Sequence, residues 1–108
     1  MMNEFEGLLE ELNRSKIIQN FSDWEESLPE DIWENHFRDR FKEIDSGLDV
    51  ETHRWYEIST CVVGIYGSLL GISYISNVFS EGIDVGDCCV DMQFFEMKEV
   101  EVVSYQKV

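Results

Sequence analysis

Outside its many acids, the chain has few side chains with the reactivity of a catalyst or a metal ligand. Its two histidines are His36 and His53, and its three cysteines are Cys61, Cys88 and Cys89. Zinc sites use about four ligands at short, recurrent spacings, and neither a C-x-x-C nor an H-x-x-x-H pair is present. A nucleophile needs an adjacent base, and no G-x-S-x-G motif or cysteine–histidine pairing provides one. We therefore expect no enzyme activity, no metal and no cofactor.

Phosphate and calcium loops are absent from the sequence as well. Gly64, Gly67 and Gly71 match no phosphate-binding loop, because no lysine follows them. The acidic stretch at 84–87 has too few carboxylates for a calcium loop. The two histidines are expected to be ordinary residues, one at the boundary of a helix and one at the junction of helices and sheet.

Acidic side chains dominate the composition. The 108 residues carry 23 Asp and Glu against 8 Lys and Arg, a net charge of −15 at pH 7. Nucleic acids and anionic membranes attract positive surfaces, so we expect no direct binding of either. A net charge of magnitude about 2 to 8 already keeps a small domain soluble. The excess adds self-repulsion and favours a cationic partner.

The densest run of acids lies between residues 23 and 39. The predicted partner-binding residues are Asp23, Glu25, Glu26, Glu30, Asp31, Glu34 and Asp39. Like charges four residues apart on a helix, such as Glu30 and Glu34, destabilise it by about 0.2–0.5 kcal/mol. A function that uses these acids would explain that cost, and a merely solvated surface is the alternative interpretation.

Helical periodicity is typical of the first 50 residues. One helix is predicted from an apolar stripe that follows a capping Asn3. A second helix is predicted over about 28–45, with a C-cap at Gly47. Ser22 and Ser27 each begin a capping-box pattern. The residues expected to pack on a sheet are Phe5, Leu8, Leu9, Leu12, Trp33, Phe37, Phe41 and Ile44, with Ile17, Ile18 and Phe21 as buried anchors between the helices.

From residue 54 onward the sequence is rich in β-branched and aromatic residues. Strands are predicted over 54–66, 69–79, 88–97 and 99–108, with a hairpin turn at Gly67 and Ser68. Their short connections favour an antiparallel meander. The expected sheet contributors are Trp55, Val63, Ile72, Tyr74, Val90 and Phe94.

These elements predict a single α+β domain over residues 1–108. Its N-terminal helical part, 1–50, would pack on one face of a four-stranded antiparallel meander sheet, 54–107. Because the strands carry apolar residues on both faces, an exposed remainder would serve as a docking surface or a homodimer interface. The acidic N-terminus, the odd number of cysteines and the lack of a long apolar run indicate a cytoplasmic protein.

Short blocks of the C-terminal half resemble small acidic proteins of phages and prophages. The blocks are HRWYE at 53–57, GI at 71–72, FSE at 79–81, FFE at 94–96 and VSY at 103–105. Some proteins of this kind are anti-defence proteins, including anti-CRISPR inhibitors. The resemblance implies an origin in a mobile element and a site of action in the bacterial host cell. It transfers no functional residue to this chain.

Charge and resemblance together predict a non-catalytic inhibitor of a nucleic-acid-handling host defence enzyme. Its partner would be a basic nucleic-acid-binding protein, such as a CRISPR effector or a restriction nuclease. The acidic face would act as a DNA mimic, since duplex DNA carries about one charge per 1.7 Å of its axis, or would steer encounter. The alternatives are an immunity protein that neutralises a toxin nuclease and a structural or scaffold module of a phage.

Overall fold

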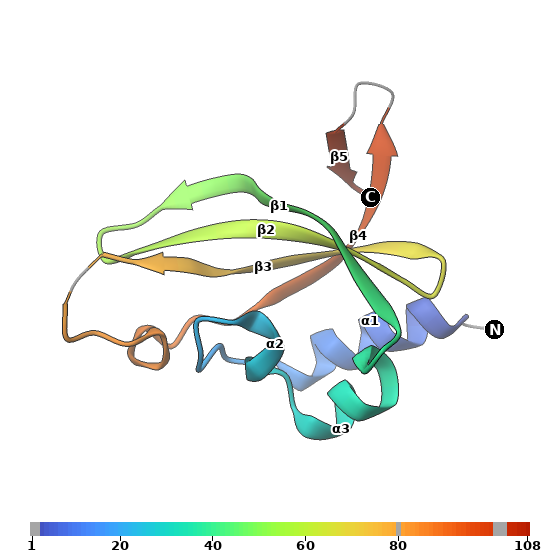
Figure 1. The fold of residues 1–108 in the computed structure, drawn as a ribbon, viewed down its shortest axis with the longest axis horizontal. Coiled ribbons are helices and arrows are strands. Elements are labelled where there is room, and N and C mark those ends of the chain that lie inside the picture. The colour runs from blue at the N-terminus through green and yellow to red at the C-terminus, as the bar shows by residue number, and fades with distance from the viewer. Residues whose placement is uncertain (1–2, 80, 101–103) are drawn as a thin grey trace.

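Helices and strands segregate along the chain into an α+β fold, as predicted (Figure 1). The computed structural model describes residues 3–79, 81–100 and 104–108, so part of the predicted last strand and two residues of the resembling blocks, Ser80 and Val103, lie outside it. The helical elements are α1 (Glu4–Ser15), α2 (Trp24–Ser27), α3 (Glu30–Ile32), the π-helical turn η1 (Trp33–Phe37) and the 3₁₀ turn η2 (Val85–Cys88). The strands are β1 (Phe41–Thr52), β2 (Tyr56–Ile65), β3 (Ser68–Val78), β4 (Gln93–Val100) and β5 (Ser104–Lys107). None of the helices in the described part of the chain is long and apolar enough to span a membrane.

The strands form one antiparallel meander in the order β1-β2-β3-β4-β5. The predicted strands correspond to β2 through β5, and β1 is an additional strand. The β2–β3 hairpin turns at Tyr66 and Gly67, one residue earlier than predicted, and both have positive φ angles of 53° and 74°. Two consecutive positive φ angles are typical of a type I′ turn, whose twist matches that of the strands. In Figure 1 the helices lie on one side of β1, β2 and β3.

The predicted helix over 28–45 is wrong beyond Phe37, and the helical part of the chain therefore ends near residue 40. The Arg38 N–H donates to the Trp33 carbonyl at 2.9 Å, which closes η1 as a π-turn. Asp39 then takes a left-handed φ of 57°, and β1 begins two residues later. β1 pairs with the edge of β2, whose backbone groups would otherwise lack partners. The sequence from 45 to 49 supports this outcome, because Asp, Ser and Gly are weak helix formers.

Gly47 is consequently no helix C-cap. It lies inside β1 with a φ of 72°, in a strand whose pairing with β2 shifts register three times. The bulges and exposed charges of β1 protect the outer edge of the sheet from pairing with another strand, because an irregular charged strand is a poor template.

Four aromatic rings bring α2, η1 and β1 together. Trp24 lies edge-on to Phe37 and Phe41, and Trp33 lies parallel to Phe37 and edge-on to Phe41. The ring centroids of these pairs and of Phe37–Phe41 are 5.6 to 6.2 Å apart, within the range of favourable aromatic pairs. We call these four residues the aromatic cluster. Phe37 is fully buried in it.

Capping follows the prediction at α1 and departs from it at α2 and α3. Asn3 accepts from the Glu6 N–H at 2.8 Å, as predicted. Asp23, not Ser22, caps α2, and α3 has no side-chain cap. The buried Ser27 hydroxyl instead accepts from the N–H groups of residues 20 and 21 at 3.2 and 3.1 Å. These hydrogen bonds hold the segment between α1 and α2 against the end of α2.

The segment between α1 and α2 is joined to the sheet by Gln19. This side chain is fully buried, and its amide donates to the Ile75 carbonyl at 3.0 Å and accepts from the Ile75 N–H at 2.6 Å. The Gln19 N–H also donates to the Val90 carbonyl. Of the three predicted anchors only Ile17 is buried. Ile18 and Phe21 are about half exposed.

The predicted core is largely correct. Buried members are Phe5, Leu8, Leu12, Phe37, Val63, Ile72 and Phe94, and Leu9, Trp33, Phe41 and Tyr74 pack partly buried against them. Ile44 is 45% exposed because it belongs to β1 rather than to a helix, and its Cδ1 lies beside Gly64. Trp55 is 46% exposed in the bend just before β2, and Val90 is only partly buried.

Phe37→Ala should destabilise the protein by about 3–5 kcal/mol, because it leaves a cavity at the centre of the aromatic cluster. Urea unfolding followed by tryptophan fluorescence measures the loss. Phe21→Ala, at a half-exposed position, is the matched control and should change the midpoint little. Equal midpoints for Phe37→Ala and the wild type would contradict this role.

Candidate functional site

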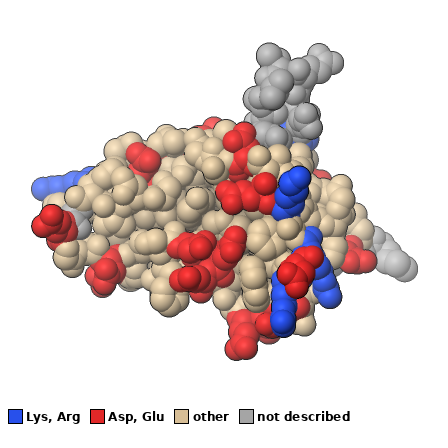
Figure 2. Space-filling model, in the orientation of Figure 1, with Lys and Arg blue, Asp and Glu red and all other residues tan. Residues whose placement is uncertain are grey.

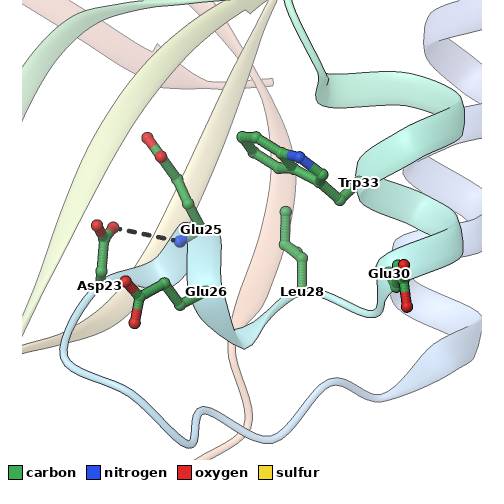
Figure 3. Close-up of a pocket in the computed structure, with 6 residues that line it drawn as sticks. All are labelled: Asp23, Glu25, Glu26, Leu28, Glu30 and Trp33. Carbon is green, nitrogen blue, oxygen red and sulfur yellow. Dashed lines mark hydrogen bonds between the residues drawn. The ribbon is translucent and has the colours of Figure 1, made fainter.

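Four of the seven predicted partner-binding acids line one groove. The groove has a volume of about 340 Å³ and is lined by Asp23, Glu25, Glu26, Leu28, Glu30 and Trp33 (Figure 3). We call it the acidic groove. Its lining comes from α2, α3, the start of η1 and the short connection between the two helices, so the feature is local in sequence.

The backbone of this segment places the apolar side chains between the acids. Leu28 leaves α2 in an extended conformation, and Pro29 continues it before α3 begins. Leu28 is buried, and Trp33 is half-buried with its ring plane parallel to that of Phe37. In Figure 3 the Trp33 indole lies over Leu28, and the Glu25 side chain stands beside the two. The groove therefore has an apolar floor and an anionic rim.

Electrostatic repulsion is concentrated at Glu25. Its pKa is raised, first by burial and then by the neighbouring charges of Asp23, Glu43 and Glu26. Among the described residues, no Lys, Arg or His side chain forms an ion pair with a carboxylate of the groove. Asp23 has a partner of another kind, because it accepts from the backbone N–H of Glu25 at 3.3 Å.

The remaining predicted acids lie outside the groove. Asp31, Glu34 and Asp39 are exposed, and Glu34 pairs with Arg38 at 2.8 Å. Figure 2 shows Asp and Glu gathered over α2, whereas over α3 and the turn that follows they alternate with Lys and Arg. The structure thus divides the predicted acids into a group without cations and a group that is partly neutralised.

Three residues of this region were missed as site residues. Leu28 had no predicted role, Trp33 was predicted only as core, and Glu43 was placed on a helix. Glu43 is on β1, paired in register with Val63, and its charge reaches Glu25. No local pattern could reveal this approach, because it depends on the pairing of β1 with β2.

The acidic charges also act on two groups of the core. Burial, reinforced by the charges of Glu43 and Glu25, raises the pKa of the Cys61 thiol to about 12. Burial raises the pKa of Tyr74 as well, together with charges that include Glu43. A thiolate is the nucleophilic form of cysteine, so Cys61 lacks the properties of a catalytic nucleophile.

A hydrogen-bonded chain of three side chains lies elsewhere in the helical layer. His36 Nε2 lies 2.9 Å from Glu11 Oε2, and His36 Nδ1 lies 3.0 Å from the Tyr66 hydroxyl. With the proton on Nε2, the ring donates to Glu11 and accepts from Tyr66. The three residues come from α1, η1 and the β2–β3 turn, so the chain joins three elements. Their spacing of 25 and 30 residues gives no signal in the sequence.

No metal site is apparent in the described part of the chain, where no group of three or more His, Cys, Asp or Glu side chains could hold an ion. Comparisons with protein-family models, curated proteins and solved structures found no match. The acidic groove is therefore interpreted from its own chemistry.

In the native protein, a thiol reagent such as Ellman's reagent should modify two cysteines and leave Cys61 unreacted. The reason is that Cys61 is buried and its pKa of about 12 leaves almost no thiolate at pH 8. All three thiols should react in denaturant. The control Cys61→Ala should keep the native count of two. A native count of three for the wild type would contradict the burial of Cys61.

Glu25→Gln should stabilise the protein at pH 7 by about 0.5 kcal/mol or less, the scale of like-charge repulsion on a surface. A raised pKa means that the folded state binds the Glu25 proton more tightly. The tighter proton binding therefore stabilises the folded state below the ordinary Glu25 pKa of 4.5, and this stabilisation is lost as the pH rises through the raised pKa.

Urea unfolding at pH 4 and pH 7 measures this difference, which should shrink at the lower pH. Asp31→Asn, at an exposed acid outside the groove, is the control and should stabilise the protein less at pH 7. A Glu25→Gln variant that is less stable than the wild type at pH 7 would show that the charge is not repelled.

Proposed function

We propose that the protein is a non-catalytic inhibitor that binds a basic surface of a nucleic-acid-handling host defence enzyme. The partner would be a CRISPR nuclease or a restriction nuclease, and the binding surface would be the acidic groove and its surroundings. The observation that carries the proposal is a set of four carboxylates around one apolar groove, with no cationic partner among the described residues.

The cost of this arrangement supports a binding role. The pKa of Glu25 is raised by burial and, after that, by the neighbouring carboxylates, and folding alone gains nothing from placing these charges together. A basic partner would relieve the repulsion and gain both association rate and specificity from complementary charge. A surface that normally binds DNA or RNA phosphates is a basic surface of this kind.

The resemblance of the C-terminal half to phage and prophage proteins favours a defence enzyme as the target. An inhibitor of this kind would act in the cytoplasm of the bacterial host. Two modes of inhibition are consistent with the charge. In the first the groove occupies a DNA channel as a mimic, and in the second it binds outside the channel and blocks a movement of the enzyme.

The triple variant Glu25→Lys, Glu26→Lys and Glu30→Lys should abolish inhibition of DNA cleavage by the target nuclease. Cleavage assays and binding at increasing salt measure the effect, and the wild-type affinity should fall as the Debye length drops below about 10 Å. If the groove is a DNA mimic, DNA and the protein should compete for the enzyme.

The matched control reverses three exposed acids that lie far from the groove in sequence, Glu10, Glu51 and Glu96. It makes the same change in net charge and should still inhibit. Equal loss in both triple variants would mean that net charge alone is responsible. Selective binding to a toxin nuclease, with CRISPR and restriction cleavage unaffected, would replace this proposal by the immunity-protein alternative.

A further inference from the structure

The acidic groove has the dimensions of a receptor for one side chain. Its volume of about 340 Å³ lies at the small end of ligand pockets, which span about 300–1,000 Å³. Its floor is apolar, formed by Leu28 and Trp33, so the aliphatic part of an occupant could be buried there. A phosphate or a carboxylate would meet only negative charge at the rim.

Trp33 presents a ring to this groove that is already held in place. Phe37 lies parallel to the indole, with an interplanar angle of 3° and ring centroids 6.2 Å apart, and Phe41 meets it edge-on at 5.7 Å. Trp33 nevertheless stays only half-buried and lines the groove. An indole is the best aromatic surface for a cation, and a fixed ring loses little entropy when the cation binds.

Glu25 is the carboxylate best placed to pair with a cation on that ring. It is the only groove acid that is partly buried, and its side chain stands beside Trp33 and Leu28 (Figure 3). Asp23 is engaged in capping α2, while Glu26 and Glu30 are exposed at the rim. One carboxylate and one indole thus line the same groove.

We propose that the groove binds a single arginine side chain of the partner protein, stacked on Trp33 and paired with Glu25. A guanidinium group is planar, stacks on aromatic rings and forms two parallel hydrogen bonds with a carboxylate. A lysine ammonium is more strongly hydrated and forms neither contact as well. That the arginine comes from a basic partner protein rests on the proposed function. That the side chain is an arginine follows from the shape and charge of the groove.

Titration of the protein with two short capped peptides tests the proposal without any nuclease. The peptides are acetyl-Gly-Gly-Arg-Gly-Gly-amide and its lysine counterpart. Binding is measured from the indole N–H signals of the three tryptophans in ¹H–¹⁵N spectra. The arginine peptide should shift the Trp33 signal and bind about tenfold more tightly than the lysine peptide. Its binding should weaken as the pH is lowered and Glu25 becomes protonated.

Glu25→Gln should weaken the arginine peptide about tenfold, since it removes the charge and one of the two hydrogen-bond acceptors. Glu10→Gln, which removes an exposed acid of α1 outside the groove, should bind like the wild type. Equal affinity for both peptides, unchanged affinity in Glu25→Gln, or no shift of the Trp33 signal would each overturn the proposal. Far-UV circular dichroism of each variant checks that it is folded.

The peptide titration and the cleavage assay fail independently. If arginine binds in the groove but no nuclease is inhibited, the proposed arginine site is supported and the proposed function is refuted. Inhibition that persists in Glu25→Gln, together with no selectivity for the arginine peptide, would refute the receptor and leave the acidic surface as the inhibitor.

Discussion

Packing of four aromatic rings is the interaction on which the other features of this structure depend. Helices as short as α2 and α3 are not stable by themselves in water, because nucleating a helix costs more than a few hydrogen bonds return. Here Trp24 and Phe37 are buried, and Phe41 extends the contact into β1. The cluster therefore fixes two short helices and an edge strand at once, and it sets the direction in which their charged residues point.

The same packing explains how mutually repelling charges can stay close together. Glu25 and Glu43 come from α2 and β1, which the cluster holds side by side although their charges oppose the approach. Apolar burial outweighs surface repulsion, since a buried aromatic ring contributes several kcal/mol and a like-charge pair costs only tenths. The structure thus keeps a local excess of negative charge next to a half-buried indole.

Sequence patterns identified the parts of this structure that are determined locally. The stripe and cap of α1 and the density of acids from residue 23 onward are properties of neighbouring residues, and both reappear in the structure. The spacing of Trp33, Phe37 and Phe41 correctly indicated that these side chains meet, but the periodicity was interpreted as one continuous helix. In the structure, a π-turn followed by a strand brings the same three side chains together. The membership of Glu43 in the acidic region depends on pairing between β1 and β2, which no local pattern contains.

The hydrogen bonds of Gln19 have a consequence for the order in which the chain folds. They join residues that are 56 positions apart, and they continue the bonding of β3 beyond Ser73, where its pairing with β4 stops. A contact that closes so long a loop forms slowly, because its entropic cost is met before any other contact compensates it. The hairpin of β2 and β3 is local and can form first, and the N-terminal segment then docks onto an existing strand. If the chain is cut between residues 20 and 56, the two fragments would therefore not fold separately, because one contains Gln19 and the other contains Ile75.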